Sequence, residues 1–229
     1  MNQFSTGLDK NKANYIPLSP LSFITRAKDI YPNYDSVVYG NRSYTWLQTY
    51  NRCTKFASAL TKQGIGLGST VSIIAANTPE LLEAHYSIPM TGGVVNTINT
   101  RLDAETIAYI LDHSDAKILI TDTQFSPTIK KALSIYGKKI PIIDIHDDQA
   151  IFKDGEGEKI GDWTYEEFLK TGEDNFNWSL PKDEWQAISL SYTSGTTGKP
   201  KGVVYHHRGS YLMSTGSVTA WNMTNKLTY

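Results

Sequence analysis

Between residues 70 and 145, short apolar runs alternate with helix-length segments, and this alternation limits the possible folds more than any other feature. Runs typical of buried strands lie at 71–75, 94–95, 117–120 and 140–145. Helices are predicted between them, at 78–90, from 103 to about 113, and from 126 onward, because cap residues and helical spacing coincide there. Strands joined by such helices need right-handed crossovers. The sequence therefore predicts an α/β chain with a doubly wound, mostly parallel sheet and flanking helices.

The segments on either side of this alternation also carry recognisable local signals. Residues 1–15 are interpreted as a flexible lead-in, followed by a helix after Ser19-Pro20. Two short strands are predicted at 37–39 and 42–44 around a tight turn. Thr45 is expected to cap a helix that Gly64 ends.

Beyond residue 145 the chain is more polar. Residues 146–161, with the Asp147-Asp148 pair and the acidic cluster at 154–158, are predicted to form a solvated loop. Thr164 and Glu167 fit a capping box ahead of another helix. Residues 187–192 are predicted to be a buried strand, because the run is apolar.

Composition excludes several classes of protein. Across 229 residues, 22 basic and 23 acidic side chains give a formal charge of −1, so a nucleic-acid partner is not expected. With 40% hydrophobic residues the chain is globular rather than disordered, and long enough for one large or two small domains. Cys53 is the single cysteine and falls in an apolar helical pattern, which predicts a buried thiol and no intramolecular disulfide. No signal peptide or membrane-spanning run is recognised, so the predicted compartment is cytoplasmic.

One segment concentrates what phosphate binding requires: residues 192–203, with the sequence YTSGTTGKPKGV. Its glycines, at 195 and 198, permit positive φ and close backbone approach to an oxyanion. Consecutive backbone N–H groups in such a turn bind anions, and hydroxyls and two lysines add donors and charge. Pro200 follows the Gly-Lys pair, so this is not the common P-loop pattern. The alternative interpretation is a solvated Gly/Ser/Thr-rich surface loop.

The same segment resembles the phosphate-loop signature of the adenylate-forming, AMP-binding superfamily. Further stretches resemble its acyl-CoA synthetase branch, in particular the acyl-activating subgroup that includes medium-chain and methylthiopropionate CoA ligases. These stretches are 13–20 (ANYIPLSP), 67–71 (LGSTV), 76–80 (ANTPE), 96–102 (NTINTRL), 109–114 (YILDHS) and 203–212 (VVYHHRGSYL). One departure is Ser69, where an aspartate is common in that family.

The resemblance implies a two-step reaction with ATP, Mg²⁺ and coenzyme A. A carboxylic acid is first activated as an acyl-adenylate and then transferred to the thiol of coenzyme A, a reaction of fatty acid metabolism. By this resemblance, Lys201 and Thr196 are the candidate catalytic residues, and Thr196 or Thr197 approaches Mg²⁺. The candidate ATP-binding residues are Thr193, Ser194, Gly195, Thr196, Thr197, Gly198, Lys199 and Lys201.

Later signatures of that family do not occur in this sequence, among them a Tyr-Gly-x-Thr-Glu motif, a ribose-binding aspartate and a C-terminal catalytic lysine. Residues 16–229 are therefore expected to be a partial N-terminal AMP-binding domain, and the isolated chain is expected to be inactive. A non-catalytic phosphate-binding fragment and an adenylate-forming enzyme with another acceptor remain as alternatives. The acid and the oligomeric state stay open.

Two further patterns are assigned structural roles. His206-His207 has no partner at ligand spacing, so a structural or surface role is favoured over metal binding. The glycines at 64, 66 and 68 superficially match a dinucleotide fingerprint. They follow a predicted helix and precede a strand, which is the wrong context for that site.

Overall fold

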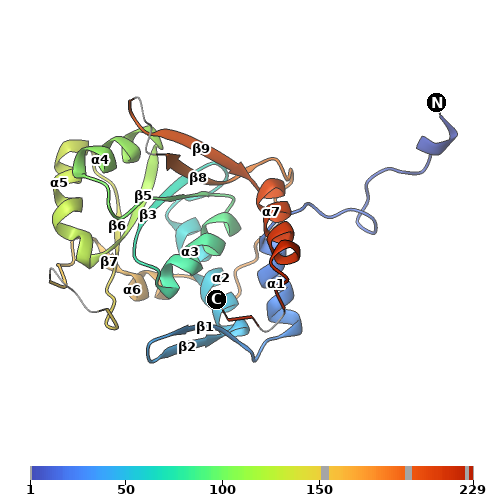
Figure 1. Cartoon of the computed structure of the whole chain (residues 1–229), viewed down its shortest axis with the longest axis horizontal. Helices are drawn as coiled ribbons and strands as arrows, with labels where there is room; N and C mark the ends of the chain where they lie inside the picture. Colours follow the sequence, from blue (N-terminus) through green and yellow to red (C-terminus); the bar gives the residue numbers. More distant parts are fainter. Residues whose placement is uncertain (1, 151–154, 194–197, 225–226, 229) are drawn as a thin grey trace.

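The computed structural model describes residues 2–150, 155–193, 198–224 and 227–228, and its centre is one twisted sheet (Figure 1). Within these residues the sheet has seven strands in the order β7-β6-β5-β3-β4-β8-β9. Neighbouring strands run parallel, except that β8 and β9 are antiparallel. The strands are β3 (Thr70–Ile74), β4 (Val94–Thr97), β5 (Ala116–Asp122), β6 (Ile142–Ile145), β7 (Trp163–Thr164), β8 (Ala187–Thr193) and β9 (Lys201–His206). The predicted fold class is confirmed.

Helices cover both faces of this sheet (Figure 1). The helices are α1 (Leu21–Ile30), α2 (Trp46–Lys62), α3 (Pro79–Met90), α4 (Ala104–His113), α5 (Ser126–Tyr136), α6 (Tyr165–Lys170) and α7 (His207–Ala220), with short 3₁₀ turns at Gln3–Ser5 and Thr123–Phe125. Helices α2, α3 and α6 pack on one face, and α4 and α5 on the other. Ile73 faces the first layer and Ile74 the second, as the two-residue repeat of a strand requires.

The helix starts follow local sequence. Thr45 and Thr164 each complete a capping box, with Gln48 and Glu167 respectively, and the Asp103 carboxylate accepts from the Thr106 N–H at 2.8 Å. Gly64 has a φ of +81° just after α2, a conformation that favours glycine. Cys53 is buried, as predicted.

A hairpin of β1 (Asp35–Tyr39) and β2 (Arg42–Thr45) lies beside the main sheet (Figure 1). It overturns one prediction, because Asp147 does not lie in a solvated loop but is fully buried. The Tyr39 hydroxyl donates to its carboxylate at 2.5 Å, and Arg42 lies 3.7 Å away. The hairpin covers Asp147 and supplies both partners, so the local polar composition misled the prediction.

The prediction of a buried strand at 187–192 was right about the strand and wrong about its burial. The strand β8 is present, but Ile188 is its one buried residue among residues 187–193. The reason is position: β8 lies next to the last strand of the described sheet, and β9 beside it is mostly exposed. Residues 2–14, predicted as a lead-in, extend from the body of the molecule and are exposed (Figure 1).

Candidate functional site

The candidate phosphate loop connects β8 to β9, and the antiparallel register sets the geometry of its ends. Thr193 pairs with Lys201, and Tyr192 pairs with Gly202. The hydroxyl-bearing end of one strand is therefore opposite the lysine that begins the next. The predicted ligands Ser194, Gly195, Thr196 and Thr197 lie outside the described residues.

A cavity of about 290 Å³ adjoins the described ends of this loop. It lies where β4 and β8, which run parallel, both reach their carboxyl ends. Its lining includes Thr97 and Asn99 on one side and Thr193 and Pro200 on the other. Ligands of open α/β sheets bind outside the carboxyl ends of the strands, so the cavity occupies the expected edge.

A second, more open cavity of about 780 Å³ lies between α4, the end of α5 and residues 198–200. Lys199 lies at its margin, with its ammonium 5.0 Å from the centre of the Tyr109 ring. The structure thus turns Lys199 toward α4, whereas Lys201 is exposed on β9. From the sequence, both lysines were candidate ATP-binding residues, and of the two the family resemblance named Lys201 alone as catalytic.

Helix α4 also contacts the strand that enters the loop. The Tyr192 hydroxyl lies 2.8 Å from His113 Nδ1, and the two rings meet edge to face. Burial, with a smaller contribution from Tyr109, raises the pKa of Tyr192, so the phenol is protonated at neutral pH and can donate to the imidazole. The sequence gave no reason to connect His113 with the loop, since 79 residues separate it from Tyr192.

A polar cluster is buried near the carboxyl ends of β5 and β6. Arg42 Nη1 donates to Glu80 at 2.7 Å, and burial, reinforced by the hydrogen bond to Asp147, raises the pKa of Tyr39 to about 12. Burial also raises the pKa of Asp122, and the nearby Asp147 adds to the effect. No group of three His, Cys, Asp or Glu side chains within the described ranges has a metal-binding arrangement. The cluster serves to attach the β1–β2 hairpin to the sheet.

Residues 24–229 match the family model described as AMP-binding enzyme. The chain belongs to the AMP-binding enzyme family. This membership explains why a glycine- and hydroxyl-rich segment follows β8, and it agrees with the resemblance seen in the sequence.

Among curated proteins, this AMP-binding chain is similar to plant acyl-activating enzymes. It is 48% identical over 230 residues to an acetate–CoA ligase of Humulus lupulus, covering 97% of this chain and 40% of the relative. It is 43% identical to a peroxisomal acetate/butyrate–CoA ligase of Arabidopsis thaliana, again covering 97% and 40%. The chain thus spans about two fifths of the length of these relatives.

Solved structures support the fold. The apo structure of MbtA from Mycobacterium smegmatis superposes with a TM-score of 0.77 at 17% identity, covering 92% of this chain and 38% of that one. An anthranilate–CoA ligase in complex with anthranoyl-AMP gives a TM-score of 0.74 at 24% identity, covering 86% and 37%. At these identities the likeness establishes the α/β fold of this AMP-binding chain.

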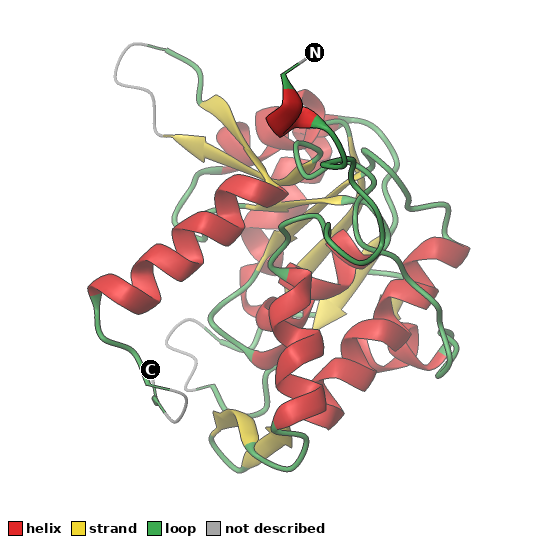
Figure 2. Cartoon of the chain, turned by 90° about the vertical axis from the view of Figure 1, so that its right-hand side faces the viewer, coloured by secondary structure: helices red, strands yellow, loops and turns green. Residues whose placement is uncertain are grey.

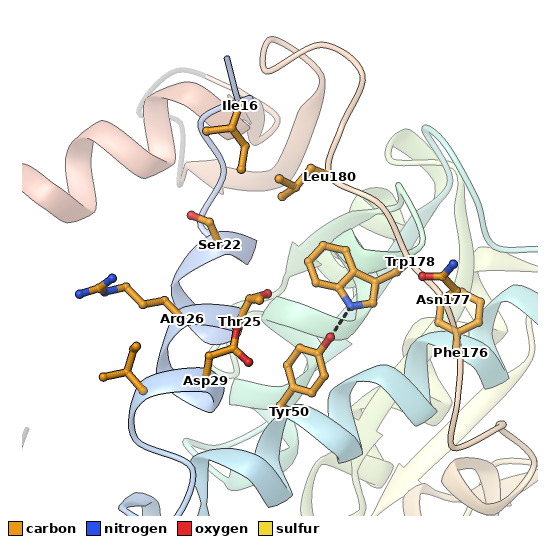
Figure 3. A pocket seen from close by; sticks show the side chains of 11 residues that line it. Ile16, Ser22, Thr25, Arg26, Asp29, Tyr50, Phe176, Asn177, Trp178 and Leu180 are labelled. Carbon is orange, nitrogen blue, oxygen red and sulfur yellow. Dashed lines mark hydrogen bonds between the residues drawn. The ribbon is translucent and has the colours of Figure 1, made fainter. Parts of the chain in front are cut away.

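A third cavity, of about 520 Å³, lies away from the phosphate loop, between α1, α2 and the connection at 176–180 (Figure 3). Trp178 and Tyr50 meet in it, the indole N–H donating to the phenol oxygen at 3.1 Å. Arg26 and Ile16 lie at its outer side and are exposed. None of the residues that line this cavity belongs to the segment 192–203.

In the part of the chain that the structure describes, no helix is long and apolar enough to cross a bilayer.

Proposed function

We propose that this chain supplies the phosphate-binding part of an AMP-forming acid–thiol ligase. The carboxylate of an acid attacks the α-phosphate of ATP, which gives an acyl-adenylate and pyrophosphate; coenzyme A then displaces AMP. The observation that carries the proposal is the segment 192–203, in a chain that belongs to the AMP-binding family. It connects two strands whose ends adjoin a cavity at the carboxyl edge of the sheet.

The roles of individual residues follow from their chemistry. The hydroxyls of Thr193 and Ser194 and the backbone N–H groups of the two loop glycines would donate to phosphate oxygens. Lys201 would offset the charge that develops on the departing pyrophosphate, which makes it a catalytic residue together with Thr196. The adenylation step needs no protein nucleophile, so its acceleration comes from positioning the reactants and stabilising charge.

The cofactor set is ATP with Mg²⁺, and coenzyme A as second substrate. The residues present fit a polyphosphate, because hydroxyl and ammonium donors gather at the loop and no carboxylate lies among residues 192–203. Mg²⁺ would be held mainly by the phosphates, with Thr196 or Thr197 as its protein contact.

The proposed substrate is a short-chain aliphatic acid. Support comes from the two relatives described above, one named for acetate and one for acetate or butyrate. A further relative from Humulus lupulus, 37% identical, is named a 2-methylpropanoate–CoA ligase. The compartment remains a prediction: the sequence favours the cytoplasm, while several relatives are named peroxisomal.

ATP–pyrophosphate exchange tests the ligase proposal. The natural polypeptide that carries this chain should exchange label with acetate, butyrate or 2-methylpropanoate, and less with benzoate and cinnamate. Lys201→Ala should slow exchange while the circular dichroism spectrum stays unchanged. Absence of exchange with every acid would refute the ligase, and unchanged exchange in Lys201→Ala would remove that residue from the site.

The second candidate is phosphate binding without turnover, favoured by the 40% share of the relatives that the chain spans. It predicts calorimetric binding of ATP or pyrophosphate by the 229-residue chain with no acyl-CoA formed. Acyl-CoA formation by that isolated chain would refute it.

A further inference from the structure

One face of α4 contacts both described ends of the phosphate loop. Tyr109 and His113 are four residues apart, so they are neighbours on the same side of the helix. His113 meets Tyr192, the second-last residue of β8, and Tyr109 meets Lys199, which lies two residues before β9. The segment 194–197 is thus bracketed by contacts to a single helix.

The two contacts are linked to each other. The rings of Tyr109 and His113 stack with their centres 5.3 Å apart and an interplanar angle of 29°. His113 then meets the Tyr192 ring at 5.7 Å and 79°, an edge-to-face arrangement, in addition to the hydrogen bond. A continuous row from Lys199 through Tyr109 and His113 to Tyr192 therefore connects the exit of the loop to its entrance.

The helix that carries this row is firmly held. Ile107, Ile110 and Leu111 of α4 are fully buried against the sheet, and Asp103 caps the first turn. The contacts of Tyr109 and His113 therefore attach the ends of the loop to a rigid helix. In contrast, β9 is mostly exposed and provides little packing of its own.

We propose that Tyr109 and His113 are positioning residues of the phosphate-binding loop. They fix the spacing and direction of its two ends before ligand binds, so less chain entropy is lost on binding. The proposal also separates the lysines: Lys199 anchors the loop to α4, and Lys201 is the lysine that meets phosphate. The positioning proposal rests on the proposed function in one respect only, namely that the ligand of the loop is phosphate.

The test compares variants that remove a contact with variants that retain it. Tyr109→Leu removes the ring beneath Lys199, whereas Tyr109→Phe keeps it. His113→Leu removes the hydrogen-bond acceptor, whereas His113→Asn places an amide oxygen near the position of Nδ1. Tyr15→Leu is the matched control, because Lys10 lies 4.3 Å from the Tyr15 ring centre in the same kind of contact, away from the loop.

Hydrogen–deuterium exchange on the ligand-free chain measures how firmly the loop ends are held. Amides of residues 192, 193, 199, 201 and 202 should exchange roughly 2- to 10-fold faster in Tyr109→Leu and His113→Leu, the range that one lost cation–π contact or hydrogen bond produces. Tyr109→Phe, His113→Asn and Tyr15→Leu should exchange like the original chain. Equal exchange in all variants would overturn the proposal.

Calorimetric titration with inorganic pyrophosphate measures how these contacts affect binding affinity. The same two leucine variants should bind roughly 2- to 10-fold more weakly with an unchanged unfolding midpoint, and the conservative variants should restore affinity. Tyr192→Phe combined with His113→Leu should be no weaker than His113→Leu alone, because His113→Leu already removes the hydrogen bond that Tyr192→Phe removes. Additive losses would overturn the coupling. If the original chain binds no pyrophosphate while exchange still responds, phosphate binding by the isolated chain fails as a function and the positioning role stands.

Discussion

Two ends of one sheet differ sharply in how they are held. Strands β3, β5 and β6 are buried almost throughout and lie between helices on both faces. At the other end, β9 is exposed, and His207 is the one buried residue in the described helix α7, which runs along the outside of the molecule (Figure 2). Exposed apolar side chains gather there, such as Val204, Met213 and Trp221.

This difference separates the part of the molecule that stabilises the fold from the part that carries the candidate functional loop. The first end supplies the hydrophobic burial that stabilises the fold. The second end carries the candidate phosphate loop and is attached through a few specific contacts: Ser19 with His207, Phe23 with Tyr211, and Glu184 with Arg208. Functional segments are commonly drawn from the less stable parts of a structure, because binding requires adjustment.

The largest expected effect comes from an ion pair in the packed end. Arg52 donates to Glu83 at 2.5 Å and to Glu166 at 2.6 Å, and burial raises the pKa of Glu83. Arg52→Met should lower the free energy of unfolding by about 3–5 kcal/mol, because it leaves a buried carboxylate without its cation. Urea denaturation measures this loss.

Two comparisons control that experiment. Adding Glu83→Gln to Arg52→Met should restore part of the stability, since the unpaired charge is gone. Arg208→Met breaks the 2.6 Å pair with Glu184 at the exposed end and should have a much smaller effect. Equal losses of unfolding free energy in the two arginine variants would contradict the conclusion that the two ends of the sheet are held differently.

A cavity in the core should have the next largest effect. Ile120 is fully buried on β5, whereas Val204 on β9 is 63% exposed. Ile120→Ala should destabilise by about 2–5 kcal/mol, through lost transfer free energy and the cavity left behind. Val204→Ala should stay within about 0.5 kcal/mol. Thermal denaturation of both variants is sufficient, and similar midpoints would contradict the assignment of stability to the packed end.

The third prediction concerns pH and the exposed end. Burial, followed by the neighbouring His206, lowers the pKa of His207 to about 4, whereas an unfolded histidine titrates near 6.5. Between these values the unfolded chain binds a proton that the folded chain does not, so stability falls as the pH drops from about 6.5 to 4. The expected loss is about 1–2 kcal/mol, allowing for solvent screening.

Unfolding midpoints measured across that pH range test this prediction. The Ser19 hydroxyl lies 2.9 Å from His207 Nδ1 and can donate to the neutral ring. His207→Gln should flatten the profile between pH 6.5 and 4 while leaving the acid transition of the carboxylates in place. A slope that persists unchanged in this variant would show that other groups cause it.

The smallest expected effect is at the contact between α1 and α7. Phe23 and Tyr211 stack with their ring centres 4.7 Å apart and an interplanar angle of 20°. Phe23→Leu and Tyr211→Leu should show a coupling energy of about 0.5–1.5 kcal/mol in a double-mutant cycle. A cycle on Phe56 and Phe168, which meet at 5.2 Å within the core, is the matched comparison. Zero coupling at α7 would mean that the helix is held by other contacts.

Features that depend on neighbouring residues in the chain were predictable. Thr45, Asp103 and Thr164 cap helices through residues three positions away, so the pattern contains both partners. The strand and helix order followed from the same local periodicity, and it determined the parallel sheet through the handedness of crossovers. The chemistry of segment 192–203 was likewise visible, although residues 194–197 are outside the described structure.

Features that depend on distant residues were not predictable. Asp147 has a polar local sequence, yet a hairpin more than 100 residues earlier buries it and supplies Tyr39. The strand at 187–192 was predicted to be buried from its apolar residues, yet its place near the sheet edge leaves it half exposed. In both cases burial depends on how many other elements pack against the segment. The local sequence does not indicate how many do.

The sequence by itself determined the order of the elements and the fold class, and it indicated the loop as the candidate phosphate-binding segment, because propensity, capping and glycine content act over a few residues. Only the tertiary structure decided which lysine faces which partner. Lys199 and Lys201 are two residues apart and chemically alike, but Tyr109 lies beneath one of them and β9 leaves the other exposed. That distinction exists only once the sheet has brought α4 to the end of β8.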